Sequence, residues 1–494
     1  MSQQPAEHAP ESFFVAQLAE RAKQSSVAAP ATLASLVDNL SYLSGDELHL
    51  IKQAHAYATH AHDGQSRRTG HAYITHPTAV AHILSDMRMD PQTIMAALLH
   101  DVIEDSATNK QTLGEKFGES VAEIVDGVSK LSKIFSSRDE AQAENFQKMA
   151  LAMAKDIRVI LVKLADRVHN MRTIGVMSSA QRRRIAKETL DFYAPIANRL
   201  GIHTLKTELE DLGFKALYPL RADLIQQSVV AARGNRKELM EEIRDTITAA
   251  MNREGIAADV KAREKNSYSI YRKMKSKHKS FADIMDVFGF RIVVDQPDAC
   301  YRALGVVHNL YKPVTSRFKD YIAIPKINGY QSLHTSLFGM HGVPIEVQIR
   351  TKQMDAVADN GIAGHWLYKS DGDFDSNQQR ARQWTKDLLE LQKRAGDPLE
   401  FIESLKIDLF PGDVYVFTPR GDIMELPTGA SAVDFAYSVH TDIGNQCVAC
   451  RVDGKLAPLS QQLESGQRVE IITSKESRPN PDWLTFVVTS RARS

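Results

Sequence analysis

The stretch AALLHDVIEDS, residues 96–106, decides how the N-terminal part of this chain is interpreted. Its apolar residues have the pattern of the buried side of a helix: Ala96, Ala97, Leu98, Leu99, Val102 and Ile103. The same stretch carries an imidazole and carboxylates, from His100, Asp101, Glu104 and Asp105. Ionised side chains are costly to bury without partners. The stretch therefore predicts a helix whose polar groups meet a compensating charge beside the core.

Composition limits the classes of protein that fit. The chain has 494 residues, enough for several domains, and its 61 basic and 61 acidic residues cancel. An overall basic surface for nucleic acid or anionic lipid is therefore absent. Three cysteines make no disulfide framework. The polar start MSQQPAEHAP lacks a signal sequence, and no apolar run reaches the roughly 20 residues of a membrane span. We expect a cytoplasmic protein with no membrane partner.

The chain divides into regions of different pattern. The pattern of residues 20–200 predicts a series of helices. It is clearest in KDIRVILVKLADRVHNMRTIG (155–175), where apolar residues recur every three or four positions. A charged helical stretch, about 200–260, precedes a mixed region with strand-like FGFRIVVD (288–295) and VPIEVQIRT (343–351). SDGDFDSNQQ (370–379) is typical of a flexible connector.

Four side chains in the helical region offer two imidazole nitrogens and two carboxylates: His76, His100, Asp101 and Asp166. This donor set suits Mn²⁺, Fe²⁺ or Zn²⁺ better than Ca²⁺. Glu104 and Asp105, one turn beyond, could orient a metal-bound water or act as general base. On the residues alone, the two acids could equally be the solvated end of an amphipathic helix. A second pair, His62–Asp63, runs into Gly64 and is interpreted as a helix end. Four further histidines (His55, His60, His71 and His82) are interpreted as surface or core residues.

Longer motifs carry a resemblance. GQSRRTGHAYITHP (64–77), LLHDVIEDS (98–106) and LVKLADRVHNMRT (161–173) resemble the HD-domain hydrolase half of the RelA/SpoT family. YSIYRKM (268–274), RFKDYIAIPKINGYQSLHTS (317–336) and PIEVQIRT (344–351) resemble its synthetase half. The resemblance implies a hydrolase that removes the 3′-pyrophosphate of guanosine tetra- and pentaphosphate, the alarmones of the stringent response. It also implies a synthetase that transfers pyrophosphate from ATP to GDP or GTP.

In the hydrolase half, the resemblance makes His76, His100, Asp101 and Asp166 ligands of Mn²⁺, and Glu104 and Asp105 the water-activating pair. Arg67 and Arg68 match positions near the nucleotide, and Asn170 and Thr173 match the guanosine pocket. Arg68 replaces a usual lysine, which keeps the charge but changes the donor geometry. Every hydrolase motif is intact, so we expect a competent hydrolase.

In the synthetase half, Ile345, Val347 and Ile349 alternate with polar residues, which predicts a half-buried strand with one polar face. Asp286 and Glu346, on separate strands, could hold Mg²⁺ against ATP phosphates. For Glu346 alone, a solvated edge strand is the simpler interpretation. The resemblance instead gives Asp286 and Glu346 the Mg²⁺ and catalytic roles, with Glu346 as base for the 3′-OH, and makes Tyr330 the guanine platform. Further nucleotide-binding candidates are Arg263, Lys265, Lys273, Arg317, Lys319, Lys326 and His334.

Departures from the family pattern gather in this half. Residues 262–265 read AREK where a Gly-Arg-Pro-Lys type of run is usual, Ser316 replaces a glycine, Ile327 replaces a small residue, and ADNGIAGHW (358–366) is altered. Loops that approach phosphates closely are sensitive to losing glycine. We therefore expect a weak or silent synthetase.

Residues 408–473 resemble a TGS domain with a β-grasp fold. VYVFTPRGDIMEL (414–426) predicts two strands across a turn, and Ser431 with Asp434 predicts a capping box. His440 matches a histidine that meets the tRNA acceptor end in ribosome-associated relatives. Cys447 and Cys450 are interpreted as structural, because positions three apart on a strand point to opposite faces.

The expected architecture is multidomain: an all-α HD-type hydrolase domain, an α/β nucleotidyltransferase-like synthetase domain and a β-grasp TGS domain. The expected boundaries are 1–20 disordered tail, 21–200 hydrolase, 201–260 helical linker, 261–395 synthetase-like, 396–407 helical connector, 408–473 TGS, and 474–494 the start of a regulatory region whose remainder is missing. Alternatives stay open: an HD phosphohydrolase for deoxynucleotides or cyclic nucleotides, a fully bifunctional enzyme, or a regulator that binds the ribosome, tRNA or a protein through TGS.

Overall fold

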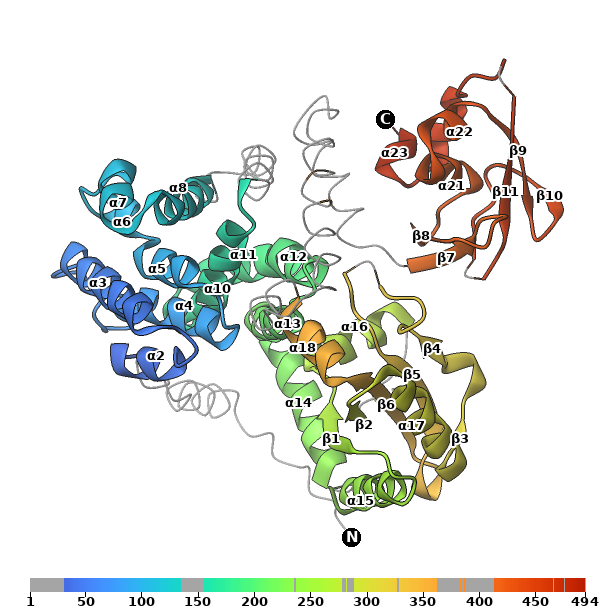
Figure 1. The fold of residues 1–494 in the computed structure, drawn as a ribbon, viewed down its shortest axis with the longest axis horizontal. Coiled ribbons are helices and arrows are strands. Elements are labelled where there is room, and N and C mark those ends of the chain that lie inside the picture. The colour runs from blue at the N-terminus through green and yellow to red at the C-terminus, as the bar shows by residue number, and fades with distance from the viewer. Residues whose placement is uncertain are drawn as a thin grey trace, which may run out of the picture.

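The computed structural model of the chain describes residues 31–134, 155–234, 237–277, 281, 288–326, 328–361, 383, 386, 413–464, 466–474 and 476–493 (Figure 1). The expected tail at 1–20, the connectors at 370–379 and 396–407, Asp286 and Ile327 lie outside the described residues. The rest forms a helical N-terminal unit, a mixed unit around a sheet and a small C-terminal unit with its own sheets. The expected fold class is confirmed.

The N-terminal unit is built from helices only, within the residues described. They are α2 (Leu33–Asn39), α3 (Gly45–Ala61), α4 (Thr75–Asp86), α5 (Pro91–Leu99), α6 (Val102–Asp105), α7 (Lys110–Phe117), α8 (Glu119–Ile134), α10 (Arg158–Arg172), α11 (Ser179–Glu188) and α12 (Ala194–Arg199). The helix predicted around 157–171 is confirmed as α10. This helix runs through the middle of the unit, and even Lys163, Asp166 and Arg167 on it are buried. Its polar side chains must therefore find partners inside the protein.

The pattern of residues 96–106 predicted one continuous helix, and this prediction is wrong. α5 ends at Leu99, His100 and Asp101 form a break, and the short α6 follows. The reason is local: His100 Nδ1 donates to the carbonyl of Ala97, at 2.7 Å, the acceptor that the N–H of Asp101 uses in a continuous helix. The break lets two successive residues, His100 and Asp101, contribute to one site.

The mixed unit is organised around a six-stranded sheet. Its strands are β1 (Ala258–Glu264), β2 (Phe288–Val294), β3 (Lys312–Pro313), β4 (Lys319–Asp320), β5 (Leu333–Phe338) and β6 (Pro344–Thr351). The order is β1-β2-β6-β5-β3, with β4 also on β5, and only the β2–β6 pair is parallel. The strands expected in 288–295 and 343–351 are confirmed.

Helices surround this sheet: α13 (His203–Leu217), α14 (Pro219–Gly234), α15 (Lys237–Arg253), α16 (Ser267–Lys277), α17 (Pro297–Leu310) and α18 (Lys352–Asn360). Val229 of α14 and Ile247 of α15 belong to the same apolar core as Ile292 and Val347 of the sheet. Helices within the stretch expected as a linker thus help to build the mixed unit. On β6, Ile345, Val347 and Ile349 face that core as predicted; the polar face is more covered than expected, because Gln348 and Arg350 are also buried.

The helical and mixed units touch at the corner between α12 and α13. Asn328 Nδ2 donates to the carbonyl of Asn198 at 2.9 Å, and Thr204 Oγ1 donates to the carbonyl of Asp359 at 2.9 Å. Gly201 and Gly361 lie backbone against backbone, and a Cβ on Gly361 would come 2.3 Å from the oxygen of Leu200. Only glycine fits such an approach, and both residues have positive φ.

The C-terminal unit contains β7 (Asp413–Phe417), β8 (Ile423–Pro427), α21 (Ala432–Val439), α22 (Thr441–Asn445), β9 (Cys447–Val452), β10 (Lys455–Ala457), β11 (Val469–Thr473) and α23 (Ser490–Arg493). The predicted β7–β8 hairpin and the capping box at Ser431 are confirmed. Cys447 and Cys450 are both buried and unbonded to each other. The residues after 473 continue this unit, because Trp483 and Val487 pack against Val433 and Tyr437 of α21.

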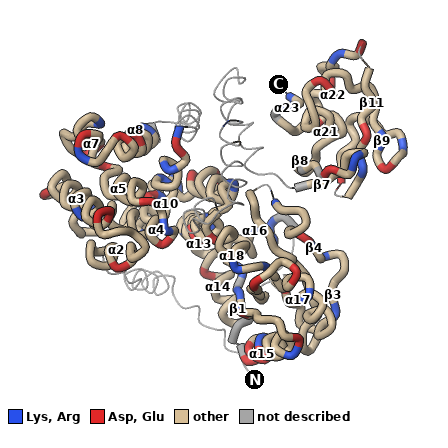
Figure 2. Tube along the Cα trace, in the orientation of Figure 1, with Lys and Arg blue, Asp and Glu red and all other residues tan. Residues whose placement is uncertain are grey.

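Charges are mixed along the described elements, with acidic and basic residues interspersed (Figure 2). Among the helices in the described part of the chain, none combines the length and the apolar character needed to cross a membrane.

Asp434 fastens the end of the chain to α21. This fully buried carboxylate accepts hydrogen bonds from Ser431 N and Oγ, and from the backbone N–H groups of Val488 and Thr489 at 3.0 and 2.7 Å. The Asp434→Ala substitution should lower the free energy of unfolding of this unit by about 3 kcal/mol, because several buried donors lose their acceptor. Hydrogen–deuterium exchange of the α21 amides would measure it. Asp442→Ala, at an exposed carboxylate of the same unit, should change it by less than about 0.5 kcal/mol.

Candidate metal centre

His76, His100 and Asp101 meet inside the helical unit. His76 is the second residue of α4, whereas His100 and Asp101 come from the break between α5 and α6. One ligand atom from each lies within 4.8 Å of the others. Asp101 Oδ2 is 3.2 Å from His100 Nε2 and 3.6 Å from His76 Nε2. Three of the four predicted ligands therefore converge.

Asp166, the fourth predicted ligand, reaches the same cluster from α10. Its Oδ1 lies 3.3 Å from His76 Nε2. Lys163 Nζ donates to Oδ2 at 2.8 Å, and Asn170 Nδ2 donates to Oδ1 at 2.5 Å. Burial alone would raise the pKa of Asp166, but the charge of Lys163 and the contact with His76 hold this pKa well below its usual range. Asp166 is thus an oriented, ionised carboxylate.

The hydrogen bond of His100 to the carbonyl of Ala97 fixes the role of its ring. Because a carbonyl only accepts, His100 Nδ1 carries the hydrogen, and in the neutral ring Nε2 keeps its lone pair. That Nε2 atom is buried and forms no hydrogen bond of good geometry among the described residues. A metal ion would satisfy it.

His76 is oriented in the same way through His169. Arg67 Nη1, which can only donate, contacts His169 Nδ1 at 3.3 Å, so His169 Nδ1 is an acceptor. His76 Nδ1, 2.8 Å from the same atom, must then carry the hydrogen, and His76 Nε2 is left for a metal. Burial, with the charges of His76 and Arg67, lowers the pKa of His169 to about 3 and keeps its ring neutral. Sequence analysis missed His169.

The residues present fit a divalent cation. The cluster offers two imidazole Nε2 atoms, each with its other nitrogen hydrogen-bonded, and two ionised carboxylates. Metal-binding histidines usually have such outer partners, which fix the tautomer and the ring orientation. The candidate ligands are His76, His100, Asp101 and Asp166.

Residues expected to contact the nucleotide lie beside this cluster. Arg67 Nη2 donates to Asn170 Oδ1 at 3.0 Å, and Asn170 in turn donates to Asp166. Thr173 ends α10, and its Oγ1 donates to the carbonyl of His169 at 3.1 Å. Arg68 is exposed and donates to Gln181 Oε1 of α11 at 3.2 Å.

The expected water-activating pair lies on α6. Glu104 is half-buried and Asp105 is exposed, and both backbone N–H groups bond to the carbonyl of Asp101. The single turn of α6 therefore places two carboxylates directly after a candidate ligand.

In the mixed unit, the structure brings Tyr330, His334 and Glu346 together. Tyr330 Oη lies 2.7 Å from His334 Nε2, and His334 Nδ1 lies 3.7 Å from Glu346 Oε1. Gln348 Nε2 also donates to Glu346 Oε1, at 3.0 Å. Burial and the neighbouring cations, first among them Lys326, lower the pKa of His334 to about 3. The proposed guanine platform and the proposed base thus lie on either side of His334, which is hydrogen-bonded to Tyr330 and only near Glu346.

Three of the predicted basic residues, Lys326, Arg263 and Lys319, act electrostatically on His334. Lys326 Nζ lies 4.8 Å from the centroid of the Tyr321 ring. Arg263 pairs with Gly289, which pairs with Glu346 on the next strand, and Lys319 pairs with His334. Burial lowers the pKa of Lys265, and Lys273 bonds to it. Arg317 lies in the short turn Thr315–Arg317 before β4.

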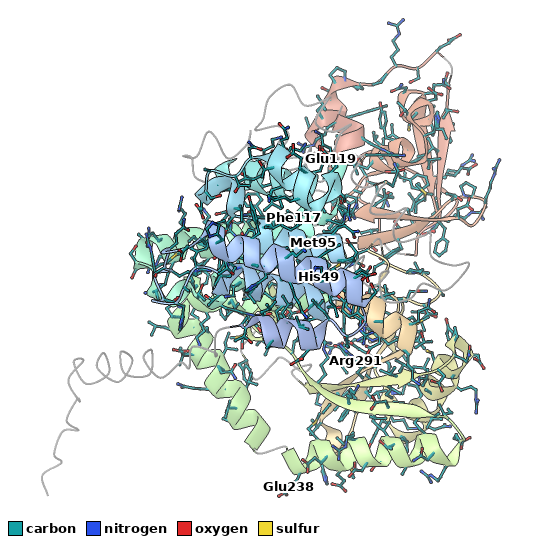
Figure 3. All side chains as sticks on the ribbon, turned by 60° about the vertical axis from the view of Figure 1, so that its left-hand side comes forward. His49, Met95, Phe117, Glu119, Glu238 and Arg291 are labelled. Carbon is teal, nitrogen blue, oxygen red and sulfur yellow. The ribbon has the colours of Figure 1, made fainter. Side chains whose placement is uncertain are left out.

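Sequence analysis missed two arginines on this face. Arg291 of β2 lies beside α18 (Figure 3), with its Nη1 3.2 Å from Asp355 Oδ1. Arg350 is only 1% exposed, contacts Asp355 through Nε, and its guanidinium lies 5.7 Å from the centroid of the Tyr330 ring. Its position two residues after Gln348 on the polar face of β6 was the available signal.

Comparison with known proteins agrees with this organisation. Residues 54–203 match the HD domain, residues 262–373 match the region found in RelA / SpoT proteins, and residues 414–473 match the TGS domain. The fold and the His/Asp cluster define a multidomain chain with an HD-type centre. In these three regions the chain is similar to proteins of the RelA/SpoT family.

The relatives carry names for both activities. The chain is 58% identical over 456 residues to the guanosine-3′,5′-bis(diphosphate) 3′-pyrophosphohydrolase of Vibrio cholerae serotype O1, and equally to the bifunctional (p)ppGpp synthase/hydrolase SpoT of Escherichia coli K12. Each match covers 92% of this chain and 65% of the relative. A GTP pyrophosphokinase of Myxococcus xanthus is 48% identical, with 92% of this chain and 60% of that protein covered. The chain thus spans less than two thirds of these relatives.

Metal binding should release a proton from His100. Burial alone would lower the pKa of His100, but the charge of Asp101 outweighs it and raises this pKa to about 9. Since a metal ligand must be deprotonated, the affinity for Mn²⁺ should rise by up to about tenfold per pH unit between pH 6 and 8. Calorimetry at pH 7, in buffers of different ionisation enthalpy, should show close to one proton released. An affinity independent of pH would contradict this assignment.

Proposed function

We propose that the helical unit hydrolyses the 3′-pyrophosphate of guanosine tetra- and pentaphosphate, giving GDP or GTP and pyrophosphate. One observation carries the proposal: two histidines present their Nε2 atoms, with the other ring nitrogen already bonded, to two ionised carboxylates beside an arginine. The names of the hydrolase relatives supply the substrate.

In this proposal His76, His100, Asp101 and Asp166 hold Mn²⁺. A bound dication polarises a phosphoryl oxygen and lowers the pKa of a bound water toward about 7. Asp105, exposed at the end of α6, and Glu104 beside it would orient the attacking water and accept its proton.

The nucleotide is bound by the residues around this centre. Arg67, held between Asn170 and His169, offers a fixed guanidinium to a phosphate, and exposed Arg68 adds a second cation. Asn170 and Thr173 line the guanosine pocket.

For the mixed unit we propose a weak pyrophosphate transfer from ATP to GDP or GTP, with Mg²⁺ held by Asp286 and Glu346. Glu346 takes the proton of the 3′-OH, and Tyr330 stacks on the guanine. Arg291, on the same face, is engaged by Asp355 and Asp359, which supports low activity in this conformation. A fully bifunctional chain is the alternative that the Escherichia coli relative favours.

The C-terminal unit is proposed to contact a ribosome, tRNA or regulatory protein. Exposed His440, whose Nδ1 accepts from Asp442 N at 3.2 Å, is the residue to test. Cytoplasmic location stays a prediction, as does the alternative in which the catalytic units are only a scaffold.

Replacing His76 by alanine should lower guanosine tetraphosphate hydrolysis more than about 100-fold, because a metal ligand is lost. Anion-exchange chromatography of reactions with Mn²⁺, and with EDTA, measures GDP release. His82→Ala is the matched control, since His82 lies on the same helix and pairs with surface Asp86. GDP release that persists in EDTA, or from His76→Ala at the parental rate, would refute the metal-dependent hydrolase.

With ATP, GDP and Mg²⁺, the parent chain should form alarmone more slowly than it hydrolyses it. Ser316→Gly, which restores the usual glycine before Arg317, should raise synthesis several-fold without changing hydrolysis. Synthesis by the parent chain that rivals its hydrolysis would instead establish the bifunctional alternative.

A further inference from the structure

Two aromatic side chains beside the metal cluster have no part in the mechanism above. Tyr73 Oη donates to Asp101 Oδ2 at 2.9 Å. The Tyr73 ring stacks on His62, with centroids 4.5 Å apart and planes at 26°. His62 does cap the end of α3 as expected, but its side chain is buried, with 3% exposed. The histidine interpreted only as a helix end therefore packs against Tyr73, the residue that donates to a candidate ligand.

Gln65 completes this arrangement. His62 Nδ1 lies 2.9 Å from Gln65 Oε1, which can only accept, so His62 Nδ1 is the donor. Gln65 Nε2 in turn donates to the carbonyl of Asp105 at 3.1 Å, and Tyr73 N donates to the carbonyl of Gln65 at 3.1 Å. Side chains and backbone thus form a connected path from Asp101 to the backbone of Asp105.

The same segment carries Arg67. Its loop is closed by an isolated bridge between Ser66 and Ala72 and by the hydrogen bond from Arg67 N to the carbonyl of His71, at 2.9 Å. The residues that hold Asp101 and the residue expected to bind a phosphate therefore belong to one short, internally bonded loop. A shift of this loop would move both.

Asp101 needs such support. Its carboxylate lies near two imidazoles and a second carboxylate, Asp166, whose charge repels it. The Tyr73 hydroxyl, held in place by the stacking of its ring on His62, supplies a hydrogen-bond donor to this carboxylate. Outer hydrogen bonds to metal-binding carboxylates commonly account for 10- to 100-fold in affinity.

We propose that Tyr73, backed by His62 and Gln65, is the positioning residue that turns Asp101 toward the metal. This inference deepens the proposed function and rests on its metal centre, but not on its substrate. It adds a specific role for the loop of residues 64–73, which links phosphate recognition by Arg67 to the geometry of the metal ligands.

The test compares Tyr73→Phe with Tyr57→Phe in the whole chain. Both changes remove one hydroxyl from a half-buried ring, but Tyr57 Oη bonds to Thr108 Oγ1, at 3.0 Å, and packs on Phe117. Titration calorimetry with Mn²⁺ should show about 10- to 100-fold weaker binding for Tyr73→Phe and parental binding for Tyr57→Phe. The melting temperatures of both metal-free variants should remain close to that of the parent.

A comparison of Mn²⁺ with Ni²⁺ affinity separates a positioning role of Tyr73 from a merely structural one. Carboxylate ligands matter more for Mn²⁺, whereas imidazoles suit Ni²⁺. Tyr73→Phe should therefore weaken Mn²⁺ binding more than Ni²⁺ binding, which relies on His76 and His100. Equal losses for both ions, or no loss for Mn²⁺, would overturn the positioning role.

Failure of this inference and failure of the proposed function are distinguishable. A parent chain that binds Mn²⁺ but leaves guanosine tetraphosphate intact would refute the hydrolase and still allow the comparison of Tyr73→Phe with Tyr57→Phe. A parent chain that binds no Mn²⁺ would overturn both.

Discussion

The burial of charge on α10 is the constraint on which the helical unit depends. Asp166 lies in the interior, where an unpaired carboxylate would be strongly destabilising. Lys163 and Asn170 bond to its two oxygens, and His76 faces one of them. Lys163 and Asn170 lie on α10 itself, whereas His76 comes from α4 and Arg67 donates to Asn170, so α4 and the Arg67 loop are positioned around this helix. The candidate metal site thus forms where the core provides partners for the buried polar side chains of α10.

Much of this could be predicted from sequence, because periodicity and long motifs carry it. The pattern of residues 155–175 predicted α10, the alternation at 343–351 predicted β6, and the motif residues His76, His100, Asp101 and Asp166 do come together. The break at His100 could not be predicted, since it follows from a side chain that takes a backbone acceptor. Nor could the role of His62, because its partners Tyr73 and Gln65 lie across a loop whose closure leaves no periodic signal.

The mixed unit illustrates a different limit. Alternation on β6 identifies its apolar face but does not tell whether the polar face meets water. Here it meets α18, and Arg350 is buried against Asp355. Arg291 is held by the same acidic helix. The local pattern thus located the apolar and polar faces of β6, while the acidic neighbours of Arg350 and Arg291 came from a segment further along the chain.

The corner between α12 and α13 gives the helical and mixed units a physical connection. Asn328, two residues before Tyr330, the proposed guanine platform, donates to the carbonyl of Asn198, and Gly201 meets Gly361 at the end of α18. Closely packed contacts of this kind do not deform gradually. A movement of the loop around Asn328, or of α18, must therefore either move residues 198–201 as well or break these contacts. Two opposed reactions in one chain would waste ATP if they ran together. Coupling of the two units through this corner would require a second conformation, in which these contacts are replaced by others. The reason is that one site influences another only by favouring one of two conformations of the protein.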